Sequence, residues 1–301
     1  MTPEAALTFV LASWSRPFVS RWSFEPAVVL PLAISGIVYT RAARTAMRRR
    51  PTPSWAGRSA SFIAGLGVLA LALVSPIDGF ADDRFWVHMV QHMLLILVAP
   101  PLLLLGRPLT LAVAASSEPS RTTLARWARS HVVRFVGSPA FGFTSFSLVL
   151  WVTHLSGLYA AALTNDAVHS LEHLAYLSAA MVFWWPVVGR DPGAARLSYP
   201  GRLLYVFLAM PVMSLLGFVI TFSDRVLYHP YIASAGSAAA ALGDQRLGGT
   251  IMWETSMLGG AVALSVVLFD WMRHEEIQAR RFEARSERAA QRGDRVEVQR
   301  G

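Results

Sequence analysis

Long apolar segments separated by short polar connections dominate the pattern of this 301-residue chain. Seven of them approach or exceed the roughly 20 residues that a helix needs to cross a bilayer. We therefore predict spans at residues 26–43, 59–77, 86–105, 136–158, 167–188, 202–222 and 249–272. An open sheet cannot satisfy its backbone in lipid, so the predicted fold class is all-α, a seven-helix transmembrane bundle.

The polar segments divide the chain into three parts around this bundle. Residues 1–25 are mildly apolar without the pattern of a signal peptide, and we interpret them as an interfacial segment before the transmembrane domain at 26–272. The arginine-rich tail at 273–301 has helical spacing and is expected to extend the seventh helix. Residues 223–248 are interrupted by Pro and Gly, and we expect a long loop that serves as a lid or docking surface.

Charge sets the expected orientation. Only 15% of residues are charged, well below the roughly 25% of soluble domains. All 27 basic residues are arginine, and most lie in residues 41–58, 107–134, 190–202 and the tail. The positive-inside rule then places the N-terminus outside and the C-terminus in the cytoplasm. The net charge of +8 is explained by topology, and we predict no nucleic-acid partner.

Five of the eight histidines fall at the predicted outer ends of the spans: His88, His92, His154, His169 and His173. Residues four apart share a helix face, so the third and fifth spans each carry a two-nitrogen clamp. A histidine near lipid is costly unless it binds a metal or haem or conducts protons. The sequence therefore predicts a metal or haem site at the outer rim.

Other side chains at this depth refine the chemistry. Glu172 lies between the second pair, Met89 and Met93 follow the first pair by one residue, and Met252 begins the seventh span. Each alone is commonly a packing or orienting residue, and their convergence favours a site. The chain has no cysteine, so a soft-metal site must use imidazole and thioether ligands. This donor set facing an oxidising compartment points to copper, as Cu(I), with zinc next.

Three alternatives remain open from the residues. The HSLEH segment at 169–173 fits the pattern of inverted zinc proteases, a weak match of five residues. One histidine from each of the third and fifth spans could ligate haem b in a redox protein. A metal transporter would need ionisable residues through the full membrane depth, which the inner halves of these spans almost lack.

Four ordered blocks carry a family resemblance. They are HMVQHMLLILVAPPLLLLG at 88–106, HSLEHLAYLSAAMVFWWPV at 169–187, LYHPY at 227–231 and GDQRLGGTIMW at 243–253. With these blocks the chain resembles the caa3-type CtaG family of cytochrome c oxidase assembly factors, which is unrelated to the single-span, cysteine-bearing copper chaperone of the same name.

The resemblance implies a multi-pass protein of the bacterial inner (plasma) membrane that acts as a chaperone and not as an enzyme. It implies copper ligation by His88, His92, His169 and His173, with His154 as a fifth donor. Asp244 and Met252, in the fourth block, could help to capture the metal. The implied partners are the lipid bilayer, a periplasmic copper donor, and a nascent cytochrome c oxidase subunit, I or II.

Overall fold

The computed structural model describes residues 21–49, 54–189, 191–193, 195 and 197–298, with the backbone alone for 287–298. The long helices are α2 (Pro26–Arg49), α3 (Ser54–Leu73), α10 (Pro139–Leu155), α12 (Asp166–Val188), α13 (Tyr199–Thr221) and α15 (Ala238–Val298). One further rod joins α5 (Phe85–Met93), the π-helical η2 (Leu94–Val98) and α6 (Ala99–Leu105). Short helices are α4 (Pro76–Ala81), α7 (Pro108–Ala115), α8 (Glu118–Trp127), α9 (His131–Val136), α11 (Leu158–Ala162) and α14 (Tyr231–Ala235). The described chain contains no strand, which confirms the all-α class.

Within the described residues, six helical stretches are long and apolar enough to cross a membrane. They are Pro26–Arg49, Ser54–Ala81, Phe85–Ala115, Asp166–Val188, Tyr199–Thr221 and Ala238–Ser286. The predicted fourth span corresponds to α10, which is apolar but only 17 residues long. The molecule is therefore a multi-pass helical membrane protein, while the count of seven spans and the orientation of the termini stay predictions.

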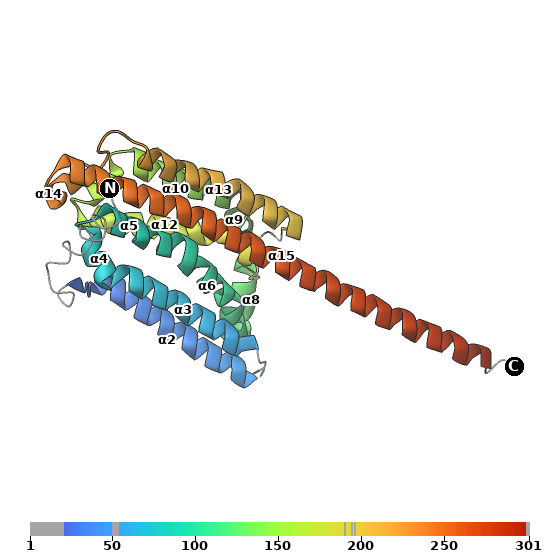
Figure 1. Ribbon diagram of the computed structural model, residues 1–301. Coiled ribbons are helices and arrows are strands. Elements are labelled where there is room, and N and C mark those ends of the chain that lie inside the picture. Colours follow the sequence, from blue (N-terminus) through green and yellow to red (C-terminus); the bar gives the residue numbers. More distant parts are fainter. Residues whose placement is uncertain (1–20, 50–53, 190, 194, 196, 299–301) are drawn as a thin grey trace.

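The helices pack as neighbours in an elongated bundle (Figure 1). α15 lies against both α13 and α5, α12 lies against α10 and α6, and α2 covers α3 and α7 at one side. Glycines allow the closest of these approaches: a Cβ on Gly217 would lie 2.7 Å from the backbone nitrogen of Trp253. A Cβ on Gly249 would likewise lie 2.7 Å from the backbone nitrogen of Thr221. Small residues at such contacts are the usual basis of helix association in lipid.

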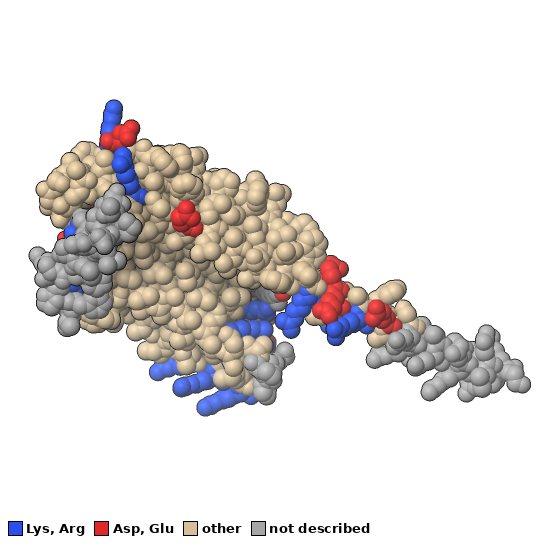
Figure 2. All heavy atoms as spheres, viewed as in Figure 1, with Lys and Arg blue, Asp and Glu red and all other residues tan. Residues whose placement is uncertain are grey.

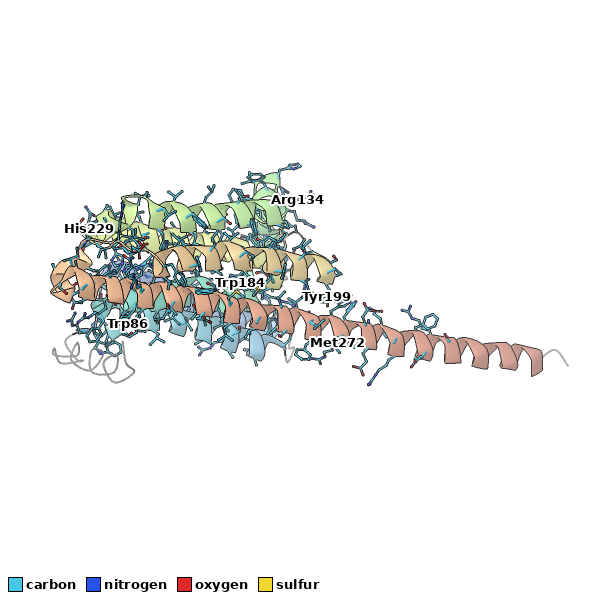
Figure 3. All side chains as sticks on the ribbon, turned by 45° about the horizontal axis from the view of Figure 1, so that its top comes forward. Trp86, Arg134, Trp184, Tyr199, His229 and Met272 are labelled. Atoms are coloured by element: carbon cyan, nitrogen blue, oxygen red, sulfur yellow. The ribbon has the colours of Figure 1, made fainter. Side chains whose placement is uncertain are left out.

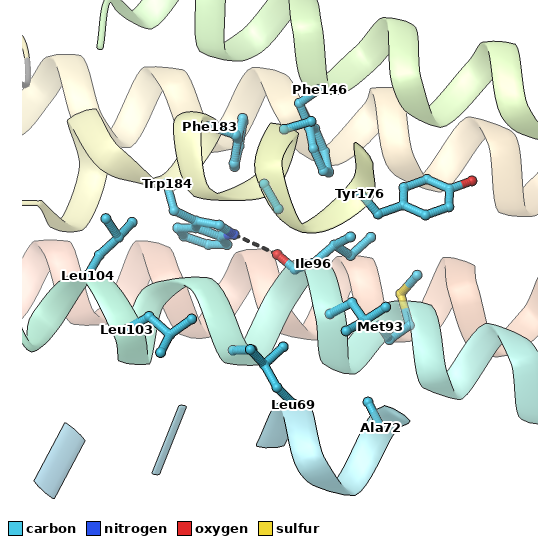
Figure 4. Packing of buried hydrophobic residues seen from close by; sticks show 14 of the residues in the cluster. Leu69, Ala72, Met93, Ile96, Leu103, Leu104, Phe146, Tyr176, Phe183 and Trp184 are labelled. Carbon is cyan, nitrogen blue, oxygen red and sulfur yellow. Dashed lines mark hydrogen bonds between the residues drawn. The ribbon is translucent and has the colours of Figure 1, made fainter. Parts of the chain in front are cut away.

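The third predicted span changes its helical pitch beside two prolines. Pro100 and Pro101 have no N–H to donate, so the carbonyl of Ile96 loses both its α-helical and its π-helical partner. The indole of Trp184 on α12 donates to this carbonyl at 2.8 Å (Figure 4). A buried carbonyl without a donor is costly, so the hydrogen bond from the indole stabilises the π-helical segment. The same bond connects α12 to α5, η2 and α6.

The expectation of a loop through residue 248 is wrong. Residues 238–248 are the first three turns of α15, and Tyr231–Ala235 form α14. An alanine-rich run favours helix, and the Ser237 hydroxyl accepts a hydrogen bond from the Ala240 backbone at 3.1 Å. One of the glycines that looked like helix breakers is a contact point, because a Cβ on Gly248 would overlap the Phe85 ring of α5.

The predicted extension of the last helix into the tail is confirmed, since α15 runs 61 residues to Val298. At 1.5 Å per residue it is about 90 Å long and projects well beyond the bundle. Figure 2 shows many of the basic side chains gathered at the end of the bundle where α15 leaves it. The interfacial segment expected at 1–25 falls largely outside the described residues. Its end is held at the other end of the bundle, where Ser23 N–H donates to the Val74 carbonyl at 3.0 Å.

Candidate metal site

The first histidine pair lies on a helix whose start is fixed from a distant part of the chain. The Asp244 carboxylate of α15 accepts hydrogen bonds from the backbone N–H groups of Phe85 at 2.8 Å and Trp86 at 3.3 Å. The Asp244 carboxylate thus caps the N-terminus of α5, where the side chain of the N-cap residue itself makes no capping hydrogen bond. One turn further on, His88 and His92 are 0% and 1% exposed and face α12.

Three imidazoles converge at this point. One ring nitrogen each of His88, His92 and His173 lies within 4.8 Å of the others. The Nε2 atoms of His88 and His92 are 2.8 Å apart, and the His173 ring centroid is 5.5 Å from that of His92. The faces of α5 and α12 therefore meet, as the i, i+4 spacing of both histidine pairs requires.

Tyr231 of α14 sets the tautomer of His88. Its hydroxyl donates to the Ala81 carbonyl at 2.9 Å, and His88 Nδ1 lies 3.0 Å from the same oxygen. Burial raises the pKa of Tyr231 well above its ordinary value, so the hydroxyl keeps its proton. That proton is committed to the carbonyl, so His88 must donate its Nδ1–H to Tyr231. The lone pair of His88 is then on Nε2, which faces the cluster.

His154 is oriented in the same sense by its own helix. Its Nδ1 lies 2.8 Å from the Leu150 carbonyl, which can only accept, so the proton is on Nδ1. The hydroxyl of Tyr176 lies 3.0 Å from this nitrogen and is also hydrogen-bonded to Thr153. The Nε2 atom of His154 is left as a buried lone pair with no partner among the described residues. Its ring centroid is 6.0 Å from that of His92.

The second pair completes the ring of donors. The His169 centroid lies 4.3 Å from that of His173 and 5.3 Å from that of His88. The Nε2 atoms of His169 and His173 are buried, and neither has a hydrogen-bond partner in the described part of the chain. Both carboxylate oxygens of Glu172 are in the same condition, and this side chain is 6% exposed. Buried polar atoms without a protein partner require a bound ion, a water or another ligand.

The other expected accessory ligands make contacts of their own in the structure. Met89 and Met93 are part of the apolar core, and Met89 packs beside Gly248 on α15. Met252 is fully buried in that core, and its carbonyl accepts from the Ser256 hydroxyl. Asp244 is engaged as the cap of α5. The structure thus brings all five predicted histidines together, and Glu172 is buried on the same helix as His169 and His173.

Sequence reasoning missed the tyrosines that support the cluster. Tyr159 of α11 and Tyr231 contact the His88 ring or its nitrogen, while Tyr176 stands 4.5 Å from the His92 centroid. For Tyr176 a signal existed, since it follows Glu172 by four residues and shares its face. Tyr159 and Tyr231 come from short helices outside the spans, and their approach to α5 depends on how the chain folds back.

Taken together, the fold and the cluster define a multi-pass helical membrane protein with a buried, histidine-rich candidate metal site. The chain belongs to the family of cytochrome c oxidase caa3 assembly factors (Caa3_CtaG), whose family model matches residues 37–274. The match includes all five histidines and confirms the resemblance seen in the four sequence blocks.

Similar proteins occur in mycobacteria. The chain is 27% identical to uncharacterized proteins of Mycobacterium bovis and Mycobacterium tuberculosis, over 96% of its own length and 46% of theirs. A protein of Mycobacterium leprae, also uncharacterized, is 26% identical over 86% of this chain and 40% of that protein. The chain therefore spans less than half the length of these curated relatives. No solved structure matches it.

Proposed function

We propose that this protein binds one copper ion, as Cu(I), between α5 and α12 and passes it to a haem–copper oxidase during assembly. The family supports a role in cytochrome oxidase assembly. Ligation by His88, His92 and His173, with His154 and His169 as exchange ligands, is the specific part of the proposal. Such a protein needs no bond-making chemistry and acts as a chaperone.

The observation that carries the proposal is the set of unpartnered ring nitrogens. Nε2 of His154, His169 and His173 and Nδ1 of His92 are buried without hydrogen-bond partners in the described structure. A buried imidazole nitrogen that neither donates nor accepts costs about 1–3 kcal/mol. Several such atoms around one point would be a large burden on stability, and a bound cation would remove it.

The spacing of the donors suits a small ion. Metal–nitrogen bonds of about 2.0–2.1 Å place two tetrahedral imidazole nitrogens about 3.3 Å apart. His88 Nε2 and His92 Nε2 stand at 2.8 Å, the length of a hydrogen bond. Binding therefore requires only that this proton moves to Nδ1 of His92 and that the rings separate by about half an ångström. Tyr231 already holds His88 in the tautomer that binds.

Glu172 supplies the charge that a buried cation needs. Placing a cation in a low-dielectric site is unfavourable unless an opposite charge accompanies it. Glu172 lies on α12 beside His173, and its carboxylate has no hydrogen-bond partner in the described chain. One carboxylate and one Cu(I) give a neutral pair, which favours a monovalent ion over a divalent one.

The direction of transfer follows from the predicted topology. The cluster lies at the end of the bundle opposite the arginine-rich connections, so we place it on the periplasmic side of the bacterial inner membrane. Copper would come from a periplasmic donor and leave to a nascent oxidase subunit, I or II. Five imidazoles exceed what one ion uses, so ligands could exchange one at a time.

The test is a Cu(I) titration of purified protein against a chromophoric competitor, with total metal measured in parallel. We expect one Cu(I) per chain in the wild type and loss of binding in His88→Ala/His92→Ala. His229→Ala is the matched control, since this histidine is exposed near the same end of the bundle (Figure 3). Cells carrying the double variant should also make oxidase deficient in copper, whereas the control should assemble it normally.

The same samples distinguish the alternatives. A Soret band in the visible spectrum would show that the site holds haem b instead of copper, and the protein would then be a redox component. Zinc bound at one ion per chain and not displaced by copper would show that the site is a zinc site. Absence of Cu(I) binding together with normal oxidase assembly in the double variant would remove the proposed function altogether.

A further inference from the structure

A basic cavity lies far from the histidine cluster, where the chain enters α10. It measures about 650 Å³ and is lined by Arg129, His131, Arg134, Phe135, Ser138, Gly193 and Ala195. Figure 3 shows Arg134 and His229 near opposite ends of the bundle. A second depression of about 600 Å³ adjoins it along α8 and shares Arg129. Neither takes part in the proposed handling of copper.

Helix caps, a closely packed glycine and a backbone hydrogen bond fix the walls of this cavity. Ser130 and Ser138 cap α9 and α10 by accepting hydrogen bonds from backbone N–H groups at 3.3 Å. Gly193 has a φ of +97° and packs so closely that a Cβ would lie 2.6 Å from a methyl of Val133. The Ala195 N–H donates to the Gly137 carbonyl at 3.1 Å. The cavity is therefore built into the fold.

Its charge is positive and uncompensated. Arg129, His131 and Arg134 are exposed, and none forms an ion pair with a carboxylate of the described chain. The nearby carboxylate of Asp191 is buried and accepts hydrogen bonds from the start of α7. Arg121 of the second depression is paired with a glutamate of its own helix and is not counted in the site.

Large apolar side chains stand exposed on the helices that form this cavity. Phe135 lines it and is 63% exposed, while Val132 on the same helix and Trp127 at the end of α8 are 71% and 55% exposed. Since the apolar α10 begins at Pro139, this rim lies where the chain passes from the membrane interface into the bilayer. Arginine heads above exposed aliphatic and aromatic groups match a lipid, which offers an anionic phosphate and an acyl chain at those two depths.

We propose that this cavity binds the phosphate headgroup of an anionic phospholipid, with the acyl chains lying along Val132 and Phe135. Guanidinium groups bind phosphate oxygens in pairs, and Arg129 and Arg134 provide two of them. Arg129 Nε donates to the Ala125 carbonyl at 3.0 Å, which leaves its terminal nitrogens available to a ligand. The lipid anchors α8 and α9 at the membrane surface.

The test uses the full-length protein in nanodiscs of phosphatidylcholine and phosphatidylglycerol, with retained lipid identified by native mass spectrometry. We expect retention of phosphatidylglycerol by the wild type. Arg129→Gln/Arg134→Gln should lower its affinity about 25-fold, since each basic side chain at an anionic surface contributes a factor of about five. Arg41→Gln/Arg44→Gln is the control, because it removes the same charge from exposed positions on α2 and should retain the lipid.

A second variant guards against indirect effects. Ser138→Asp keeps a side chain able to cap α10 and places a carboxylate in the cavity, so it should expel phosphatidylglycerol without lowering the melting temperature. Equal retention by the wild type and Arg129→Gln/Arg134→Gln would overturn the proposal. So would an equal loss in the α2 control, which would indicate general surface charge. Displacement of the lipid by millimolar inorganic phosphate would instead indicate a site for the free anion and would also overturn it.

Discussion

Replacing Tyr231 by phenylalanine tests whether a hydroxyl outside the spans prepares the candidate metal site. The hydroxyl makes two good hydrogen bonds, to the Ala81 carbonyl at 2.9 Å and to His88 Nδ1 at 3.0 Å. Its contact with the Tyr159 hydroxyl, at 3.4 Å, is too long to contribute much. The phenyl ring would keep the packing and remove both hydrogen bonds.

Two separate effects follow from this change. The Ala81 carbonyl and the His88 N–H become buried groups without partners, which lowers the free energy of unfolding by about 1–3 kcal/mol. The His88 proton is no longer confined to Nδ1, so part of the population carries it on Nε2 and cannot bind. Loss of such a supporting hydrogen bond commonly weakens metal binding about 10- to 100-fold, which equals about 1.4–2.7 kcal/mol.

The assay is the Cu(I) competition titration, combined with imidazole ¹⁵N chemical shifts that report the His88 tautomer. Tyr228→Phe is the matched control, since Tyr228 is equally buried but its hydroxyl only reaches the His154 carbonyl at 3.4 Å. We expect this control to bind within about twofold of the wild type. If Tyr231→Phe also bound within twofold, the assigned role of the tyrosine would be refuted even though the copper proposal stood.

Three further substitutions test the packing around the site by thermal unfolding in detergent. Trp184→Phe should lower stability by about 1–3 kcal/mol because it removes the donor to the carbonyl beside the two prolines, whereas Trp185→Phe, whose indole nitrogen has no partner in the described chain, should cost less. Gly248→Ala should destabilise the protein by about 1–3 kcal/mol, because the added methyl group overlaps with α5. Gly243→Ala, with open space around it, should be neutral or stabilising. Equal effects of the two substitutions would contradict the close approach of α5 to Gly248. Asp244→Ala should cost about 0.5–2 kcal/mol as a lost cap, and a fall in copper affinity without any loss of stability would instead favour the ligand role predicted from the sequence.

Periodicity predicted the parts of this protein that depend on short sequence distances. Spacing of four residues placed His88 with His92 and His169 with His173, and alternating apolar and arginine-rich segments placed both pairs at one end of the bundle. Hydrophobic length identified six helical stretches long enough to cross a membrane, while α10, with 17 residues, leaves the seventh span a prediction. These inferences needed only helix geometry and the cost of charge in lipid.

Features that depend on tertiary contact were beyond such reasoning. The glycines at 248 and 249 suggested a loop, and only the approach of α5 and α13 shows why helix α15 tolerates them. Asp244 looked like a candidate for metal capture, yet its carboxylate caps a helix that begins 159 residues earlier. The hydroxyl of Tyr231 reaches His88 across 143 residues, and no local pattern encodes that contact.

The bond between Trp184 and Ile96 also has a consequence for the depth at which the two histidine pairs meet. Trp184 lies three turns below His173 on α12, and Ile96 lies one turn below His92 on the neighbouring rod. Two helices with apolar surfaces can shift along each other in lipid, because apolar contacts are not directional and do not fix the relative depth of the helices. The hydrogen bond from the Trp184 indole to the Ile96 carbonyl resists such sliding, and it thereby fixes the relative depth of the two helices at which their imidazoles meet.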